Sequence, residues 1–236
     1  MLFSVCLEAQ SYRTVVLTPK AKKSTQLNGS SQYWTKATAT GMDFGTATDF
    51  SIIAWAKHST TAFGGLQRLA GKSASPSARF MFVGGASGNV MSALVSDGTN
   101  SALLHGITSV NDNKWHLFVM TADRDGFLRL YVDGIEEGTA LSLATVGSVT
   151  TSSAFEVGGI GAASFWNGSV GEVQVVSGYV LTATEVSALA KTKTLKASYG
   201  GGSLVAWYQW NGGLDKSGSG NHLTPVSSPL IVNVRY

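Results

Sequence analysis

Short runs of hydrophobic residues, separated by polar turn residues, recur along the whole chain and predict β-strands. The runs are rich in β-branched and aromatic residues, which favour strands, and turn signals containing glycine bound most of them. The strands predicted in this way are residues 3–7, 12–17, 50–56, 80–83, 89–95, 115–121, 127–132, 154–157 and 169–176.

Asn-Gly and Asp-Gly dipeptides lie between these runs and predict tight hairpins, because the residues of such turns adopt positive φ angles readily. They occur at residues 28–29, 97–98, 125–126, 133–134, 167–168 and 211–212. The clearest hairpin is 116–132, in which Leu128, Leu130 and Val132 alternate with residues that point to the opposite face. A turn at 133–134 follows, so the pattern is typical of an antiparallel meander.

One helix is predicted near residues 182–191. Thr182 and Glu185 have the spacing of a capping box, in which each side chain binds the free backbone amide of the other residue. Val186 and Leu189 follow at helical spacing, and Lys191 suits the negative end of the helix dipole. Because helices do not alternate with the strands, we predict an all-β, antiparallel two-sheet sandwich with one short surface helix.

Five blocks of the sequence share their order and spacing with a known superfamily. They are residues 27–33, 49–56, 114–116 with 125–134, 157–159 with 166–173, and 181–186. In the second block, Phe50, Ser51 and Trp55 match a common Phe-Ser-x-x-x-Trp pattern. Over roughly residues 25–190 the chain resembles the laminin-G-like, concanavalin A-like jelly-roll superfamily. The resemblance implies a jelly-roll sandwich of the kind found in secreted binding proteins and in bacteriophage structural proteins.

The same resemblance divides the chain into three parts. We expect a LamG-like jelly-roll domain over residues 26–226, with an N-terminal strand extension at 1–25 and a C-terminal tail at 227–236. Residues 203–223 resemble the segment that usually opens such a domain, although here it comes last. We therefore expect residues 200–226 to fold back as a permuted first strand. The alternative is that they pair with a neighbouring subunit.

Composition and charge narrow the function classes. Apolar residues make up 44% of the chain, which suits a packed core, and no apolar run reaches the roughly 20 residues of a membrane helix. The net charge is only +3, and the lysine clusters at 20–23 and 191–196 lack interleaved aromatic residues, so nucleic acid is not an expected partner. Cys6 is the single cysteine, and the N-terminus has no signal-peptide pattern, which suits folding in a reducing cytosol.

The sequence does not contain the residue patterns of an enzyme. A glycoside hydrolase needs two opposed carboxylates, but Glu172 stands alone, and the neighbours Glu136 and Glu137 would face opposite sides of a strand. There is no Gly-x-Ser-x-Gly elbow, and the four histidines do not form a zinc-binding pair. The glycine-rich segments 71–73 and 159–164 are interpreted as loops of the sheets. We predict a protein that is not an enzyme.

Two sets of residues are candidates for ligand binding. Trp34, Trp166 and Trp210 lie near turns, where an exposed indole could stack on a sugar. The resemblance also implies that Ca²⁺ is a candidate ion at the rim of the sandwich, and Asp215 and Asn221 offer the hard oxygen ligands that it prefers. The alternative for Asp215 and Asn221 is a turn in which both side chains bind their own backbone. No other cofactor is expected.

These observations favour a non-enzymatic structural or adhesion module. Its expected setting is a virion, where it decorates a capsid or belongs to a tail after synthesis in the host cytoplasm. Its expected partners are other particle subunits, further copies of itself in a homo-oligomer, and a glycan. The alternative is a secreted or surface lectin-like protein, extracellular and Ca²⁺-dependent. A glycoside hydrolase ranks third.

Overall fold

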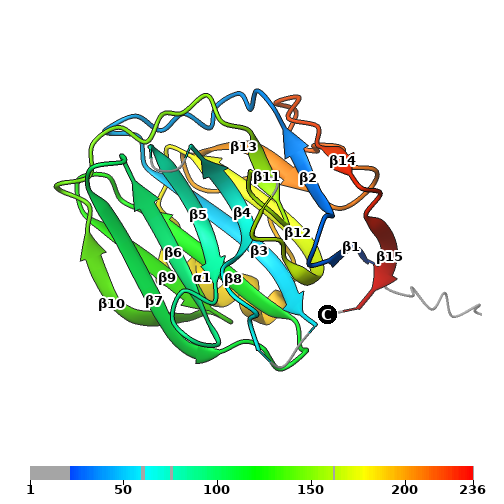
Figure 1. The fold of residues 1–236 in the computed structure, drawn as a ribbon. Coiled ribbons are helices and arrows are strands. Elements are labelled where there is room, and N and C mark those ends of the chain that lie inside the picture. Colours follow the sequence, from blue (N-terminus) through cyan, green and yellow to red (C-terminus); the bar gives the residue numbers. More distant parts are fainter. Residues whose placement is uncertain (1–21, 60–61, 75–76, 162, 236) are drawn as a thin grey trace, which may run out of the picture.

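Two antiparallel sheets pack face to face, as the sequence predicts (Figure 1). A computed structural model describes residues 22–59, 62–74, 77–161 and 163–235. Sheet A contains, in order, β10 (Ile135–Ser142), β9 (Phe127–Val132), β8 (His116–Ala122), β3 (Phe50–His58), β12 (Asn167–Ser177), β1 (Lys22–Asn28) and β15 (Leu230–Val234), with β13 (Ser203–Tyr208) also paired to β12. Sheet B contains β14 (Thr224–Val226), β2 (Tyr33–Lys36), β11 (Phe155–Val157), β4 (Gln67–Ser73), β5 (Arg79–Gly84), β6 (Val90–Ser96) and β7 (Ser101–Ser109).

The strands predicted from residue 50 to residue 176 all form, and most lie within a residue or two of their predicted bounds. At the predicted turn after β9, Asp133 and Gly134 adopt φ angles of 51° and 89°. The turn predicted at 167–168 is wrong, because these residues begin β12. A Cβ at Gly168 would lie 2.1 Å from the carbonyl oxygen of Lys57, so glycine at this position allows β12 to pack closely against β3. The strands predicted at 3–7 and 12–17, with Cys6, lie outside the described residues.

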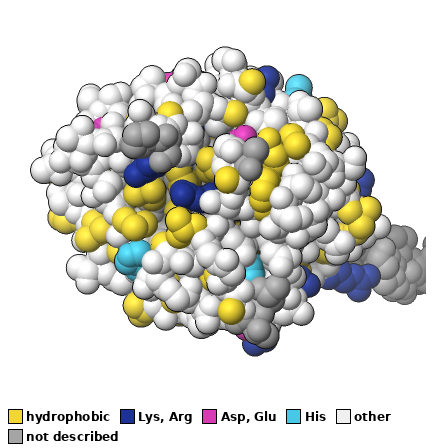
Figure 2. Space-filling view, viewed as in Figure 1, with side chains coloured by type: hydrophobic (Ala, Val, Ile, Leu, Met, Phe, Trp, Pro, Cys, Tyr) yellow, Lys and Arg dark blue, Asp and Glu magenta, His cyan; other side chains and the backbone are white. Residues whose placement is uncertain are grey.

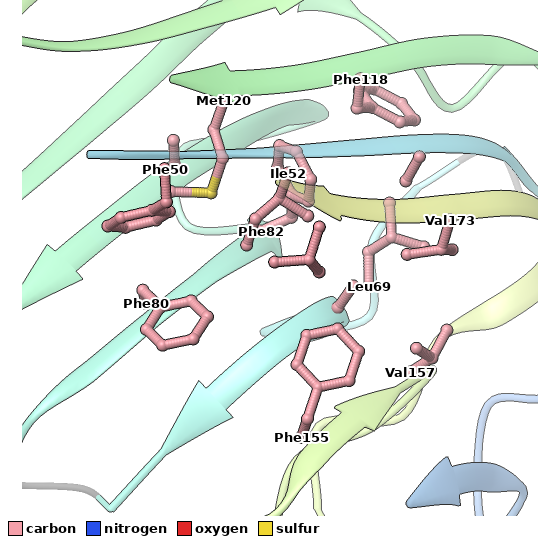
Figure 3. Packing of buried hydrophobic residues seen from close by; sticks show 14 of the residues in the cluster. Phe50, Ile52, Leu69, Phe80, Phe82, Phe118, Met120, Phe155, Val157 and Val173 are labelled. Carbon is pink, nitrogen blue, oxygen red and sulfur yellow. The ribbon is translucent and has the colours of Figure 1, made fainter. Parts of the chain in front are cut away.

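The main core lies between the two sheets. Phe50 and Phe118 of sheet A and Phe80, Phe82 and Phe155 of sheet B point toward one another in Figure 3, and all are buried. Alternation along each strand sends these side chains inward and their neighbours outward. At 25 cal/mol per Å² of apolar surface, burial of aromatic side chains of this size is the main stabilising contribution to such a sandwich.

The outer face of sheet A carries a second apolar layer. Helix α1 (Ala183–Thr192) buries Val186 and Leu189 against this face, behind the sandwich in Figure 1. The predicted capping box forms at Thr182 and Glu185. The cluster also contains residues from the strands and from the segments on either side of the helix: Ile53, Trp55, Leu117, Val119, Tyr131, Val176, Leu181, Leu195 and Tyr199. In the described part of the chain, no helix has the length and apolar character to cross a membrane.

The C-terminal segment folds back onto its own chain. β13 pairs with residues 173–177 of β12, while β1 pairs with residues 167–170 of the same strand, so the two share one edge of β12. β15 then pairs with the outer edge of β1. The predicted boundary between residues 25 and 26 falls inside β1, and residues 230–234 of the predicted tail form β15. Both ends of the described chain therefore contribute strands to sheet A.

A buried carboxylate joins the far edges of the two sheets. Glu137, on the edge strand β10 of sheet A, accepts hydrogen bonds from the backbone amides of Ile107 (2.6 Å) and Thr108 (2.7 Å) on β7 of sheet B. The Thr108 hydroxyl donates to the other carboxylate oxygen at 2.6 Å. The adjacent Glu136 is exposed and pairs with Arg129, which confirms that the two glutamates face opposite sides.

Replacing Glu137 with glutamine should destabilise the fold by about 2–3 kcal/mol, because an NH₂ group, which donates and cannot accept, replaces one of the two carboxylate oxygens that accept hydrogen bonds from β7. Urea unfolding monitored by circular dichroism would measure the change. Glu136→Gln is the matched control, and its exposed ion pair should contribute less than about 1 kcal/mol. Equal effects of the two substitutions would contradict the role assigned to Glu137.

Candidate functional site

The three tryptophans predicted to bind sugar are core residues, so that prediction is corrected. Trp34 is 2% exposed, and Trp166 and Trp210 are 0% exposed. The Trp34 indole donates to the Thr25 hydroxyl at 2.9 Å, and the Trp34 and Trp210 rings lie 5.3 Å apart. Proximity to a turn did not indicate the direction of the side chain. A buried indole has no face available for stacking on a sugar.

Asp215 binds the backbone of its own loop, as the alternative interpretation predicts, whereas the Asn221 side chain binds more distant backbone. The Asp215 carboxylate accepts from the backbone amides of Trp207 (2.9 Å), Ser217 (2.9 Å) and Asn221 (3.0 Å). The fully buried Asn221 side chain bonds the backbone of Thr40 and Val205. The oxygens of both side chains are thus occupied by backbone amides, and the prediction of a Ca²⁺ site at this pair is corrected.

The outer face of sheet B differs from that of sheet A, because α1, the one helix of the described residues, packs on sheet A. Figure 2 views this face and shows Lys and Arg side chains near its centre, with hydrophobic side chains around them. Met81, Val83, Leu94 and Ile160 form a small apolar cluster there, separate from the main core. All four side chains are buried, so other groups on this face cover the cluster.

A hollow of about 370 Å³ lies beside this cluster, between strand β4 and the loop that follows β11. Its walls combine apolar side chains with hydroxyl groups and one guanidinium, and they are formed by Arg68, Ser73, Ala74, Ile160, Gly161, Ala163 and Ser164. The loop is held against β4, since the amide of Arg68 donates to the Ser164 carbonyl at 2.7 Å and that of Gly158 to the Leu69 carbonyl at 2.8 Å. Such a mixed, concave surface suits a small polar ligand.

Arg68 is the charged group of this hollow. Its guanidinium lies against the sulfur of Met81, and no carboxylate lies within ion-pair distance of it among the described residues. Burial and then the positive charge of Arg79 lower the pKa of Arg68. The side chain therefore carries a positive charge that its described surroundings do not neutralise.

An aromatic pair lies on the same face. The rings of Tyr33 on β2 and Phe165, next to Ser164, are 5.9 Å apart, and both side chains are partly exposed. Trp34 points into the core, so Tyr33, its neighbour in the strand, points outward. β11 lies between β2 and β4, so these two strands are about 10 Å apart. This distance is comparable with the length of a short oligosaccharide.

The acidic side chain of Glu156 contacts this region. It lies on β11, accepts from the amide of Gly161 at 2.7 Å, and lies 3.4 Å from the Thr35 hydroxyl. Burial raises the pKa of Glu156. Hydrolysis of a glycosidic bond needs a second carboxylate across the scissile bond. The hydrogen bonds of Glu156 go to Gly161 and Thr35 and not to a second carboxyl group.

The residues with the geometry to hold a metal ion lie elsewhere, at the end of the β8–β9 hairpin. Carboxylate oxygens of Asp49, Asp123 and Asp125 lie within 4.8 Å of one another. A hydrogen bond with Asp125, partial burial and the charge of Asp49 raise the pKa of Asp123. Three oxygen ligands suit a hard cation such as Ca²⁺. Sequence reasoning missed this group, because Asp49 is 74 residues from Asp123 along the chain.

The fold is thus an antiparallel jelly-roll sandwich with one open outer face. A family model described as the concanavalin A-like lectin/glucanases superfamily, of laminin G type, matches residues 28–187. The chain belongs to this superfamily, which confirms the resemblance noted in the sequence. No curated protein matches the chain by sequence.

Solved structures share this fold at low sequence identity. A putative carbohydrate binding protein from Bacteroides ovatus has a TM-score of 0.65 at 15% identity, over 92% of this chain and 61% of that one. A heptameric SAP-like pentraxin from Limulus polyphemus has a TM-score of 0.56 at 11% identity, over 73% of this chain and 83% of that one. Domains LG4-5 of the mouse laminin α1 chain have a TM-score of 0.50 at 17% identity, over 66% and 41%. The chain spans less than two thirds of the first and third of these structures.

The aspartate group predicts an unusual pH dependence. Because the pKa of Asp123 is raised, folding loses stability as pH rises from the ordinary aspartate range through that raised value. In EDTA, Asp123→Asn should therefore raise the free energy of unfolding at pH 7, by less than about 1 kcal/mol since solvent screens the group. The gain should vanish near pH 3, as urea unfolding at both pH values would show.

Asp112→Asn is the control with the opposite sign. Burial alone would raise the pKa of Asp112, but hydrogen bonds with His116 and Lys114 hold it at about 2. Its stabilising contribution is present above the ordinary pKa and is lost as pH falls toward 2, so this variant should be less stable than wild type at pH 7. A loss of stability in Asp123→Asn at pH 7 would contradict the assignment.

Proposed function

We propose that this protein is a non-enzymatic carbohydrate-binding module, and that it binds a saccharide on the outer face of sheet B. The observation that carries the proposal is the contrast between the two outer faces. Helix α1 and the segment after it bury the outer face of sheet A, whereas the outer face of sheet B holds a hollow of about 370 Å³. The superfamily and the name of the Bacteroides ovatus protein are in line with this function.

The chemistry of the face suits a sugar. A pyranose ring has apolar C–H faces that pack on aromatic and aliphatic side chains, and hydroxyl groups that need hydrogen-bonding partners. Tyr33 and Phe165 supply the aromatic surface, with the Ser164 hydroxyl next to Phe165. Arg68 and Ser73 supply polar groups on β4, which lies about 10 Å from β2. The site would thus engage an oligosaccharide in an extended conformation, with one sugar on the rings and another in the hollow.

A role without catalysis is supported by the placement of the acidic residues. Glu137 and Asp215 are committed to backbone hydrogen bonds, and Glu172 lies in sheet A beside Lys22 and Gln209. Asp49, Asp123 and Asp125 lie at the β8–β9 hairpin. Glu156 contacts the proposed binding face through Gly161, and one carboxylate does not provide the acid and base of a glycosidase.

The setting that we propose is a virion, with the module acting as a capsid-decorating or tail-associated adhesion protein and assembling with copies of itself. A chain with a single cysteine does not use an intrachain disulfide, which suits assembly in a reducing host cytoplasm. An extracellular lectin is the alternative setting. Co-sedimentation of the purified protein with particles would support a virion role, and a protein that stays monomeric and never associates with particles would contradict it.

The aromatic pair gives the direct test of the binding face. Phe165→Ala should weaken binding to the best ligand of a glycan array about fivefold to tenfold, because the ring packs on the sugar. Isothermal titration calorimetry would measure the dissociation constants.

Phe127→Ala is the matched control, because Phe127 is 46% exposed but lies on sheet A. It should leave the affinity unchanged. Absence of binding to any saccharide by the folded protein would overturn the proposed function, and equal effects of the two substitutions would overturn the proposed location.

A further inference from the structure

We infer that the hollow on sheet B takes an anionic group, so that the preferred ligand is a saccharide bearing carboxylates or sulfate esters rather than a neutral one. The inference rests on the proposed function and adds a ligand class to it. The argument depends on Arg68, whose guanidinium lines the hollow.

Other arginines of the protein show how this chain usually accommodates a guanidinium. Arg129 pairs with Glu136 on the surface of sheet A. Arg124 is buried and donates to the carbonyls of Val146 (3.0 Å) and Gly147 (2.5 Å), with the charges of Asp49 and Asp97 acting on it. In both cases the positive charge is offset by carboxylates of the protein.

Arg68 lacks such an offset. Its Nε atom is buried without a hydrogen-bond partner among the described residues, as are Nε and Nη1 of Arg124. Unlike Arg124, Arg68 has the sulfur of Met81 against its guanidinium and the positive charge of Arg79 acting on it, with no carboxylate acting on it. Desolvation and like charge both raise the free energy of the charged side chain. An anion in the hollow would lower this free energy, since a partly desolvated guanidinium forms strong, charge-assisted hydrogen bonds.

The one carboxylate beside the hollow does not take this role. Glu156 is directed to the amide of Gly161 and to the Thr35 hydroxyl, and it forms no ion pair with Arg68. Burial raises the pKa of Glu156, and no positive charge lowers it. Arg68 is therefore the group in the lining of the hollow that offers N–H donors and a positive charge to an anion.

The geometry also favours a particular kind of anion. A guanidinium presents parallel N–H donors that match the two oxygens of a carboxylate or of a sulfate ester. The surrounding hydroxyls of Ser73 and Ser164 suit the sugar hydroxyls next to such a group, and Ile160 suits the apolar ring face. A sugar with an acidic substituent uses all three features at once.

The experiment compares three polymers on the wild-type protein: polygalacturonate, the same polymer after reduction of its carboxyl groups, and a sulfated galactan. Calorimetric titration should give tighter binding to at least one anionic polymer than to the neutral one, by about tenfold or more. That preference should shrink as NaCl rises from about 0.05 M to about 0.5 M, because salt screens the charge. The polymer that binds identifies carboxylate or sulfate as the group recognised.

Substitutions then assign the charge to its residue. Arg68→Gln should remove the preference for the anionic polymer while changing affinity for the neutral one less than about threefold, and Arg68→Lys should restore part of it. Arg129→Gln, on sheet A, is the matched control and should change neither the affinity for the anionic polymer nor that for the neutral one. If Arg68→Gln does not fold, Arg79→Gln should reduce the preference through the same field, and the three-polymer comparison needs no variant.

The failures of the two proposals are distinguishable. Equal binding of the charged and the carboxyl-reduced polymers, or an anionic preference that Arg68→Gln leaves unchanged, would overturn the anionic class while the saccharide-binding function stands. Absence of binding to all three polymers and to a glycan array would overturn the function itself.

Discussion

Burial of the outer face of sheet A under helix α1 decides which of the two outer faces of the sandwich is covered by the described chain. Trp55, Leu117 and Tyr131 point away from the main core, and helix α1 with the chain after it covers them. A two-sheet sandwich has two outer faces, and here one of them is part of a second hydrophobic cluster. The outer face of sheet B carries the hollow with the Arg68 guanidinium and a partly exposed aromatic pair, and it is the face that we propose for ligand binding.

Buried polar side chains hold the two sheets in the arrangement that this division needs. Glu137 joins β10 to β7 at one edge, while Asp215 and Asn221 fix the loop that returns the chain from β13 to β14. Each of these side chains bonds backbone groups that would otherwise be buried without partners, and such groups are costly to leave unsatisfied. These hydrogen bonds therefore maintain the shape of the proposed binding face, although the side chains that form them do not line the hollow.

The sequence predicted the fold well but the site poorly, for a physical reason. Strands such as Phe50–His58 and the cap at Thr182 depend on local patterns, which a sequence displays directly. Strand β4 escaped prediction, and residues 71–73 were interpreted as a loop, because Arg68, Gly71 and Lys72 interrupt its apolar pattern. The hollow is assembled from β4 and a loop some 90 residues later, and the inward direction of Trp34 and Trp210 depends on the packing of both sheets. Neither feature has a local signature.

Hydrogen–deuterium exchange with and without a bound oligosaccharide tests the central claim most directly, because it locates the ligand on one of the two sheets. The account predicts added protection in the loop that carries Ile160 and Ser164 and at the ends of β2 and β4, with no change in α1. Protection confined to α1 and the chain after it, or to the β8–β9 hairpin around Asp123, would contradict it.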